Sequence, residues 1–274
     1  MNVKKPMREI SPEIVLLAAL SAELRLIKRG YAQKQREVHL RMAKALRFKF
    51  SRSEQLKYIA HLDILRVFER ALKRSKLPLA YTQGFNPRQK LVFGLPMSIG
   101  LTSEAEYADI EFEQDVAPED FIRSMNSSLP EGIRILEAVE QNINDNIMNQ
   151  ITAAKYEIGL ETREDISQNE MDNILHRLLS RDEIFVLKKT KKGMRPVNIR
   201  PWIYSLSIRK KEMNSFLMEA FLSAGAENNL RADLLMQAFN QETGLEAKTL
   251  AMHRKALYAS SFNKWQDPFE VANG

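Results

Sequence analysis

Apolar and polar residues repeat at strand spacing and then at helix spacing through the first half of the chain. Leu46–Phe50 alternates strictly, which predicts a half-buried strand. His61–Ser75 has apolar residues three and four positions apart, which predicts an amphipathic helix. The other elements expected in this half are strands over 79–81, 90–93, 106–112 and 133–139 and a short helix over 118–128. The predicted order is β-α-β-β-α-β, which is the ferredoxin-like unit.

A similar order begins again after a polar stretch without periodicity. Residues 154–160 alternate, and Ser167 and Glu170 form a capping box that predicts a helix ending near Leu179. The remaining elements expected here are strands over 184–187, 197–199, 202–208 and 216–222, a helix over 231–240, and a closing strand or helix over 249–258. The two halves show no convincing sequence repeat, so the second module is predicted from element order alone.

The predicted fold class is therefore α+β, with two ferredoxin-like modules in tandem and an N-terminal helical arm. The expected boundaries are 1–41 for the arm, 42–141 for the first module, 142–151 for a linker, 152–262 for the second module and 263–274 for a tail.

Residues 1–41 have the features of a basic helix outside both modules. Ser11 and Pro12 form a helix start, an apolar stripe follows, and Gly30 ends it. Nine Lys/Arg against four Glu give this segment a net charge of +5, out of +6 for the whole chain. The arm is either an appendage, an over-extended start of the reading frame, or a helix that binds a partner.

Charge is also polarised within the first module. Residues 51–100 hold nine basic and three acidic residues, whereas 101–150 hold two basic and twelve acidic residues. This pattern indicates either a face that meets phosphate or two segments that neutralise each other after folding.

Composition excludes several classes of chemistry. The chain has no cysteine, which rules out disulfides, thiolate zinc sites, iron–sulfur clusters and a cysteine nucleophile. It has four histidines and neither a P-loop nor a Gly-x-Gly-x-x-Gly motif, so we expect no metal and no cofactor. No apolar run is long enough to span a membrane, and a cytoplasmic location is expected.

The stretch 78–111 holds most of the candidate chemistry. Gly84 permits a positive φ and Pro87 restricts Asn86, so the loop presents its polar side chains in a defined shape. Phe85, Tyr81 and Tyr107 are candidates for stacking on bases. Glu106 is expected to face solvent, and Glu104 to cap a turn or pair with a basic neighbour. A structural hairpin is the alternative interpretation of this stretch.

Several of these segments resemble the radical-SAM-linked family of unknown function. They are Tyr58–Ile64, Arg66–Arg74, Leu77–Pro87, Gly100–Tyr107, Lys192–Gly193 and Asn198–Pro201. Members of that family are fused behind, or encoded beside, a cobalamin-type radical S-adenosylmethionine (radical SAM) protein. The resemblance covers about residues 42–258. It departs at Arg88-Gln89, where the family has His-Pro, and at Ala60, where Ser or Gly is usual.

The resemblance implies a partner, a separate radical SAM protein, and leaves three functions open. The first is an accessory protein that binds transfer or ribosomal RNA and presents it to that enzyme. The second is an RNA-processing or nucleotide-modifying enzyme that uses His61 and Glu104, with Asp63 as a further catalytic candidate. The third is a structural subunit of the radical SAM enzyme. Without cysteine this chain holds no radical SAM cluster of its own, which favours a non-catalytic role.

The residues expected to contact RNA combine a basic helix face, the polar loop and two later basic positions. They are Arg66, Arg70, Arg74, Gln83, Gly84, Phe85, Asn86, Arg88, Lys90, Lys192 and Arg200.

Overall fold

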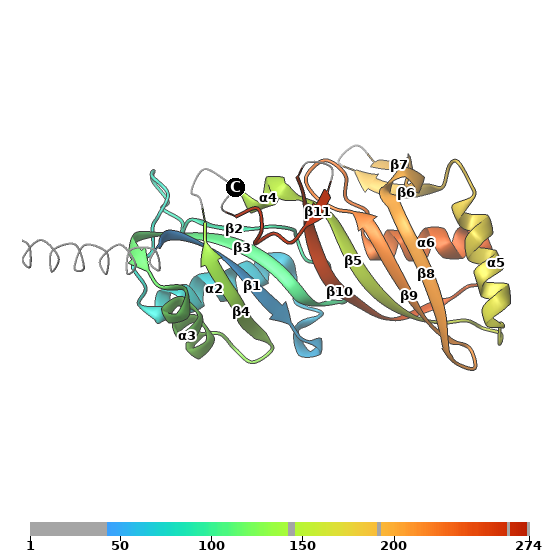
Figure 1. Ribbon diagram of the computed structural model, residues 1–274, viewed down its shortest axis with the longest axis horizontal. Coiled ribbons are helices and arrows are strands. Elements are labelled where there is room, and N and C mark those ends of the chain that lie inside the picture. The colour runs from blue at the N-terminus through green and yellow to red at the C-terminus, as the bar shows by residue number, and fades with distance from the viewer. Residues whose placement is uncertain (1–42, 142–145, 191–192, 262–263, 273–274) are drawn as a thin grey trace, which may run out of the picture. The chain divides into compact units, whose positions relative to one another are not determined.

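The computed structural model describes residues 43–141, 146–190, 193–261 and 264–272. The chain divides into two units, 1–42 and 43–274. The first unit, and with it the predicted helical arm, lies outside the described residues. The second unit is of the α+β class, with a large mixed sheet and few helices (Figure 1).

The first half of the second unit packs two helices on one face of its strands. Its elements are β1 (Ala43–Arg52), a 3-10 turn (Glu54–Leu56), α2 (His61–Ser75), β2 (Leu91–Phe93), β3 (Leu101–Val116), α3 (Pro118–Ser128) and β4 (Ile133–Glu140). Phe48 of β1 lies against Phe68 of α2 and Phe121 of α3, with ring centroids 5.9 and 5.1 Å apart. The two helices therefore cover the same face of the sheet.

Helix α2 has the bounds that its apolar spacing predicts. It begins after Ala60, whose backbone is extended, and it ends at Lys76, which adopts the left-handed conformation with φ of 59°. The buried residues Ile64, Phe68 and Leu72 form the stripe that meets β1 and β3. The prediction of this helix is confirmed.

The second half has the same succession of main elements, with one extra hairpin, a short extra helix and a short extra strand. Its elements are α4 (Ile147–Gln150), β5 (Ile151–Glu161), α5 (Gln168–Leu179), β6 (Phe185–Thr190), β7 (Gly193–Asn198), a 3-10 turn (Arg200–Trp202), β8 (Ile203–Glu212), β9 (Ser215–Ser223), α6 (Ala232–Thr243), β10 (Lys248–Ser261) and β11 (Lys264–Gln266). Ser167 caps α5 as predicted, because its hydroxyl accepts a hydrogen bond from the Glu170 amide at 3.2 Å.

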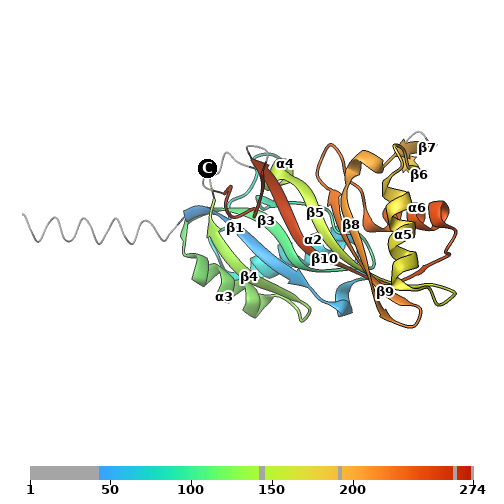
Figure 2. The same cartoon turned by 45° about the vertical axis from the view of Figure 1, so that its right-hand side comes forward.

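All the main strands join one sheet. The described residues form a nine-stranded sheet of order β4-β1-β3-β10-β5-β9-β8, in which β2 pairs with β3 and β11 with β10. Strand β10 lies between β3 and β5 in both views (Figures 1 and 2). It pairs parallel to β3 through Leu101–Ser103 and Met252–Arg254, which joins the two halves edge to edge. Strands β6 and β7 form a separate two-stranded ribbon.

Each half arranges its strands in the same relative order. In the first half the order is β4-β1-β3, with β2 on the far edge of β3; in the second half it is β10-β5-β9-β8. We count β1, β2, β3 and β4 as the first to fourth strands of the first half, and β5, β8, β9 and β10 as those of the second half. In both halves the fourth strand lies next to the first, the first next to the third, and the third next to the second. The segment 249–258, predicted as a strand or a helix, is a strand. Within the predicted linker, 147–150 form α4 and 142–145 lie outside the described residues.

The burial of Glu106 corrects the sequence-based expectation for this residue. Along β3, Glu106 alternates in phase with Ala108, Ile110 and Phe112, which lie in the core with α2 and α3. Phe50 pairs with Glu106 and Arg52 with Ser103, so β3 holds one more residue than β1 between these pairs, and this bulge separates the exposed Glu104 from the buried Glu106. Glu106 is only 1% exposed, and the expectation that it faces solvent is wrong.

The sheet face of the first half that points away from α2 and α3 is covered by the end of the chain. Arg47 of β1 donates to both carboxylate oxygens of Asp109 at 2.7 and 3.0 Å, and to the Pro268 carbonyl at 2.8 Å. Asp109 also accepts a hydrogen bond from the Ile147 amide at 2.9 Å. Arg47 is fully buried by this arrangement.

Tyr107 lies under the same C-terminal segment. Its hydroxyl donates to the Asp267 carboxylate at 2.9 Å, and its ring meets Phe269 edge-on at 5.1 Å. Tyr107 is 2% exposed, so it is unavailable for stacking on a base, contrary to the sequence-based expectation. In the described part of the chain, no helix is long and apolar enough to cross a membrane.

Candidate nucleic-acid interface

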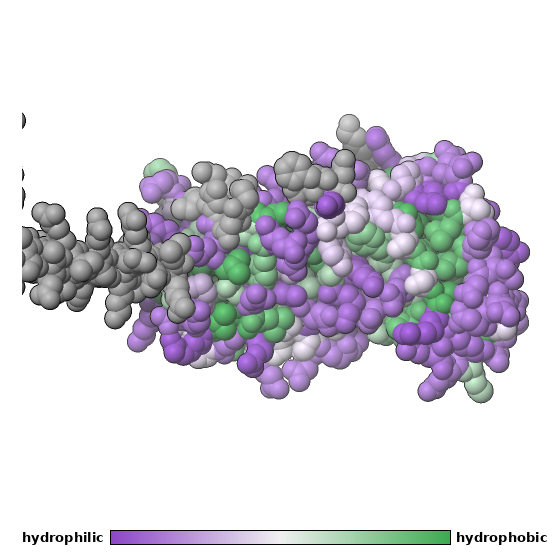
Figure 3. Space-filling model, viewed as in Figure 1, coloured by the Kyte–Doolittle hydropathy of each residue, from purple (hydrophilic) through white to green (hydrophobic). Residues whose placement is uncertain are grey.

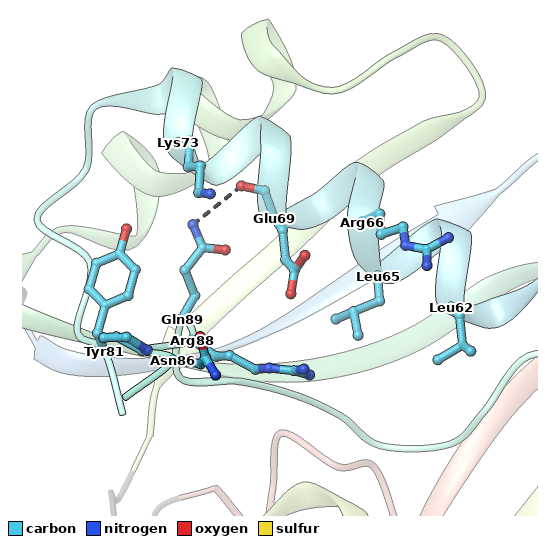
Figure 4. A pocket seen from close by; sticks show the side chains of 10 residues that line it. Leu62, Leu65, Arg66, Glu69, Lys73, Tyr81, Asn86, Arg88 and Gln89 are labelled. Atoms are coloured by element: carbon cyan, nitrogen blue, oxygen red, sulfur yellow. Dashed lines mark hydrogen bonds between the residues drawn. The ribbon is translucent and has the colours of Figure 1, made fainter. Parts of the chain in front are cut away.

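A groove runs between α2 and the loop of residues 81–89. Its volume is about 630 Å³, and it is lined by Leu62, Leu65, Arg66, Glu69, Lys73, Tyr81, Asn86, Pro87, Arg88 and Gln89. Figure 4 shows α2 along one side of the groove and the loop residues along the other. The structure therefore brings three predicted contact residues, Arg66, Asn86 and Arg88, to one place.

Local hydrogen bonds hold the loop in shape. The Thr82 amide donates to the Arg88 carbonyl at 2.8 Å, and the Arg88 amide donates to the Thr82 hydroxyl at 3.0 Å. Gln89 anchors the loop to the helix, since its side-chain amide donates to the Glu69 carbonyl at 3.2 Å. Gly84 has a φ of 125°, which L side chains rarely adopt.

The groove has a cationic rim. The described residues that line the groove include three basic ones, Arg66, Lys73 and Arg88. Glu69 is the single acidic residue among them. Arg66 pairs with Asp63 at 2.7 Å, but both side chains are more than half exposed, so the pair contributes little and can open for a ligand. Among the described residues no ion pair involves Lys73 or Arg88. The rim is suited to an anionic ligand.

Phe85 stands at the tip of the loop and is fully exposed to solvent. Tyr81 is 38% exposed and lines the groove. An aromatic ring beside cationic side chains offers a stacking surface for bases and neutralises phosphate charge. Proteins that bind single-stranded nucleic acids combine these two features.

The other predicted basic residues are not all at the groove. Arg74 donates to the Ser128 carbonyl of α3 at 2.7 Å, and Arg70, though exposed, does not line the groove. Lys90 pairs with Glu111 at 2.6 Å. That pair joins the basic segment to the acidic one, so part of the polarised charge is neutralised within the fold. The predicted basic helix face therefore does not form one surface, because Arg66, Arg70 and Arg74 have different surroundings.

The three catalytic candidates are not brought together. Asp63 pairs with Arg66, and Glu104 lies beside Lys255 and His253 at 2.6 and 3.3 Å. His61 instead packs edge-on against Phe93 at 5.5 Å. Within the described ranges no group of three or more His, Cys, Asp or Glu side chains could hold a metal ion. The arrangement provides no acid–base pair formed by His61 and Glu104.

His61 lies close to two buried guanidinium groups. Burial, followed by the charges of Arg52 and Arg254, lowers the pKa of His61 below its usual value. Its Nδ1 atom is buried and has no hydrogen-bond partner among the described residues. Burial and the two guanidinium charges therefore both favour the neutral form of His61.

Two buried arginines near His61, Arg52 and Arg254, were not among the residues predicted from the sequence to matter. Arg254 of β10 donates to both oxygens of Glu106 at 2.7 Å, and both side chains are 2% exposed. Arg52 donates to the carbonyls of Leu56, Lys57 and Ile59, and so fixes the turn that leads into α2. A charged residue within an apolar strand was the available signal for both positions.

The two later basic candidates differ in their surroundings. Arg200 donates to the Leu179 carbonyl at 2.8 and 3.1 Å and to the Ile203 carbonyl at 3.3 Å, so its guanidinium serves the fold. Lys192 lies outside the described residues. Gln83 is exposed on the 81–89 loop but does not line the groove.

With this geometry in place, the chain can be compared with known proteins. It belongs to the family described as "Uncharacterized protein conserved in bacteria (DUF2344)", whose model matches residues 45–232. No curated protein matches the chain.

Three solved structures are similar to the chain at low sequence identity. The chain is similar to a crystal structure of a Cbf5–Nop10–Gar1 complex, with 10% identity, a TM-score of 0.47, and coverage of 81% of this chain and 50% of that one. An archaeal box H/ACA sRNP Nop10–Cbf5 complex is similar with 10% identity, a TM-score of 0.44, and coverage of 80% of this chain and 48% of that one. An H/ACA RNP bound to a substrate RNA containing 2'-deoxyuridine is similar with 9% identity, a TM-score of 0.42, and coverage of 80% of this chain and 48% of that one. The chain spans about half the length of these structures.

Proposed function

We propose that this protein binds transfer or ribosomal RNA in the cytoplasm and presents it to a separate radical SAM enzyme that modifies it. The observation that carries the proposal is the groove between α2 and the 81–89 loop, with its cationic rim and the exposed Phe85 beside it. Cationic side chains bind the phosphate backbone, and exposed rings stack on unpaired bases.

The rigidity of the loop supports a binding role. Gln89 and Thr82 fix the loop backbone, so Asn86 and Arg88 are presented without a large ordering cost when a ligand binds. Phe85 contributes nothing to the hydrophobic core from its exposed position, which favours a role in contact with a partner molecule.

The partner enzyme has a separate candidate surface on the β6–β7 ribbon. Phe185, Leu187 and Met194 are 43%, 53% and 58% exposed. The register places Leu187 opposite Pro196, and Phe185 lies two residues away on the same face of β6. An exposed apolar stripe on a two-stranded ribbon favours contact with another protein. The sequence resemblance to the radical-SAM-linked family supports the identity of that partner.

The proposal extends to the architecture. We infer that the two halves are ferredoxin-like modules, because each has β-α-β-β-α-β elements in the same spatial order. On this inference the β6–β7 ribbon is an insertion in the second module, and it carries the protein-contact surface.

The proposal is tested by measuring the binding of labelled tRNA and rRNA fragments as a function of salt. Replacing both Arg66 and Arg88 with Gln should reduce the salt slope by about two units, or about one per lost phosphate contact. The matched control replaces Arg123 and Arg163 with Gln, two exposed arginines away from the groove (76% and 80% exposed). Equal slopes in the two double variants would refute the groove as the RNA site.

The loop tip gives a second arm of the test. Phe85→Ala should weaken binding by about 5-fold to 150-fold, the ratio for one lost stacking contact, and should leave the melting temperature unchanged. Co-purification with the radical SAM protein should survive the groove substitutions and should be lost on Leu187→Asp. Loss of the enzyme from the groove variant instead would show that the two surfaces are wrongly assigned.

A further inference from the structure

Four aromatic side chains form a continuous cluster on the second half of the sheet. Tyr204 of β8 lies 5.3 Å from Phe221 of β9 and 5.1 Å from Trp265 of β11, measured between ring centroids. Phe221 is also 5.3 Å from Trp265 and 5.4 Å from Tyr258 of β10. Three strands and the short β11 thus bring their rings to one place.

The cluster lies on the sheet face that the helices leave open. Along β9 the alternate residues Phe216, Met218 and Ala220 are buried in the core with α5 and α6, so Phe221 points the other way. Tyr204 and Trp265 are each 43% exposed. On the face seen in Figure 3, apolar and near-neutral residues gather over β5, β8, β9 and β10 between hydrophilic margins.

A polar hollow adjoins the cluster. It has a volume of about 470 Å³ and is lined by Asn149, Ile151, Thr152, Tyr204, Ser223, Ala224, Gly225, Ala226, Glu227 and Asn228. Tyr204 belongs to both the hollow and the ring cluster. Among the described residues, no Lys or Arg lines the hollow, whereas amide, hydroxyl and backbone groups do.

Two details show that the hollow is closely built. The Thr152 hydroxyl is buried and has no hydrogen-bond partner in the described structure, so it has a donor and an acceptor to offer. Gly225 has a φ of 136°, and a Cβ atom there would lie 2.2 Å from the Ile151 carbonyl oxygen. Only glycine lets the loop after β9 approach the start of β5 this closely.

We propose that the ring cluster and the hollow form a nucleobase-binding site, in which an unpaired base of single-stranded RNA stacks on Tyr204 and Trp265. The edge of the base then faces the neutral polar groups of the hollow, which match its donors and acceptors. Lys264, exposed beside Trp265, and Lys155, opposite Phe221 in the strand register, can meet the flanking phosphates. This inference rests on the proposed RNA-binding function and adds a second contact point to it.

Charge distribution favours a base over other ligands. A free phosphate would have no cationic partner inside the hollow and would meet the Glu227 carboxylate. Aromatic rings with amide neighbours also suit a carbohydrate, so an oligosaccharide is the competing ligand in the test.

Trp265 is itself the probe. The chain has two tryptophans, and Trp202→Phe leaves Trp265 as the single tryptophan, whose emission can be excited selectively. A short single-stranded oligouridylate should quench Trp265 emission, whereas the abasic oligomer of the same length should not. Equal quenching by the abasic oligomer, quenching by an oligosaccharide in its place, or no quenching by any of them would overturn the proposal.

Binding of the oligouridylate by variants separates this site from the groove. Tyr204→Ala and Trp265→Ala should each weaken binding by about 5-fold to 150-fold, the ratio for one stacked base, in protein that circular dichroism shows to be folded. The matched control is Tyr58→Ala, which removes a tyrosine that is 70% exposed outside the cluster. Wild-type affinity in the folded Tyr204→Ala protein would overturn the site.

The groove substitutions distinguish failure of this proposal from failure of the proposed function. With Arg66 and Arg88 both changed to Gln, saturating oligouridylate should still quench Trp265. If oligouridylate still quenches Trp265 in this double variant and binds it with wild-type affinity, the groove is not the RNA surface and the base site stands. If the groove variant loses affinity and the wild type shows no base-dependent quenching, the groove stands and the base site falls.

Discussion

The two halves of the sheet share a strand order but treat the face away from their helices in opposite ways. In the first half that face is closed, because the C-terminal segment covers Arg47, Asp109 and Tyr107. In the second half it is open, and it presents the rings of Tyr204 and Trp265 to solvent. The same arrangement of strands therefore supports a structural face in one half and a candidate binding face in the other.

This difference places the candidate sites. With its sheet face closed, the first half has its candidate binding residues at the edge, between α2 and the 81–89 loop. The second half can use the sheet itself. Shared topology therefore does not carry shared function, because function depends on which surfaces remain accessible.

The largest expected effect comes from breaking the closed face. Arg47→Ala leaves the buried Asp109 carboxylate without its bidentate partner and the Pro268 carbonyl without its donor. We expect the free energy of unfolding to fall by about 3–5 kcal/mol, as for other buried pairs with one partner removed. Urea unfolding followed by circular dichroism measures this change.

The matched variant on the open face is Lys155→Ala. Lys155 pairs with Glu219 at 3.0 Å, and the two side chains are 42% and 39% exposed. Removing this pair should cost under about 1 kcal/mol, because solvent screens it. If the two variants were equally destabilised, the distinction between the two faces would be lost.

A smaller effect should follow from Tyr107→Phe, which removes the hydrogen bond to Asp267. We expect a loss of about 1 kcal/mol. Tyr204→Phe, on the open face, should change stability little, since no hydrogen bond of the Tyr204 hydroxyl is found among the described residues.

The dependence of the free energy of unfolding on alkaline pH gives a sharper test of the Tyr107 prediction. Burial, together with Asp267, raises the pKa of Tyr107 above its usual value of 10.0. The folded state therefore holds the phenol proton more tightly, and this stability is lost as the pH rises above about 10. Tyr107→Phe should flatten the fall in stability between about pH 10 and 11. A fall as steep as that of the wild type would show that Tyr107 is not the group responsible.

The smallest effect is expected at Glu104, at the boundary between the two halves. The Lys255 ammonium, and then His253, lower the pKa of Glu104 below its usual 4.5. This contribution is present above pH 4.5 and is lost as the pH falls through the lowered pKa. Because Glu104 is 49% exposed, Glu104→Gln should cost under about 0.5 kcal/mol at neutral pH. A loss above 1 kcal/mol in thermal unfolding would contradict this assignment.

The sequence predicted elements whose signals are local. The bounds of α2 and the capped start of α5 follow from apolar spacing and from Ser167, all within a few residues. The sequence also placed Arg66, Asn86 and Arg88 among the candidate contacts, and the structure brings them to one groove.

What depends on distant residues was not predictable in this way. Glu106 lies buried against Arg254, a partner 148 positions later in the chain, and no local pattern indicated this pair. Tyr107 is buried by residues 160 positions later in the chain. The ring cluster draws on four separate strands, and each aromatic residue taken alone looks like ordinary strand composition.

The C-terminal cover has a consequence for how the protein is made. Arg47 and Pro268 are 221 positions apart, yet this contact helps to bury the Arg47 side chain. During synthesis β1 leaves the ribosome long before Pro268 does, so the Arg47 guanidinium stays hydrated until this later segment has been made. Contacts between such distant positions also slow folding, because the loop must close before they form. We expect the nascent first half to remain protease-sensitive until the segment of residues 264–272 emerges, and a translation pause before this segment to prolong that sensitivity.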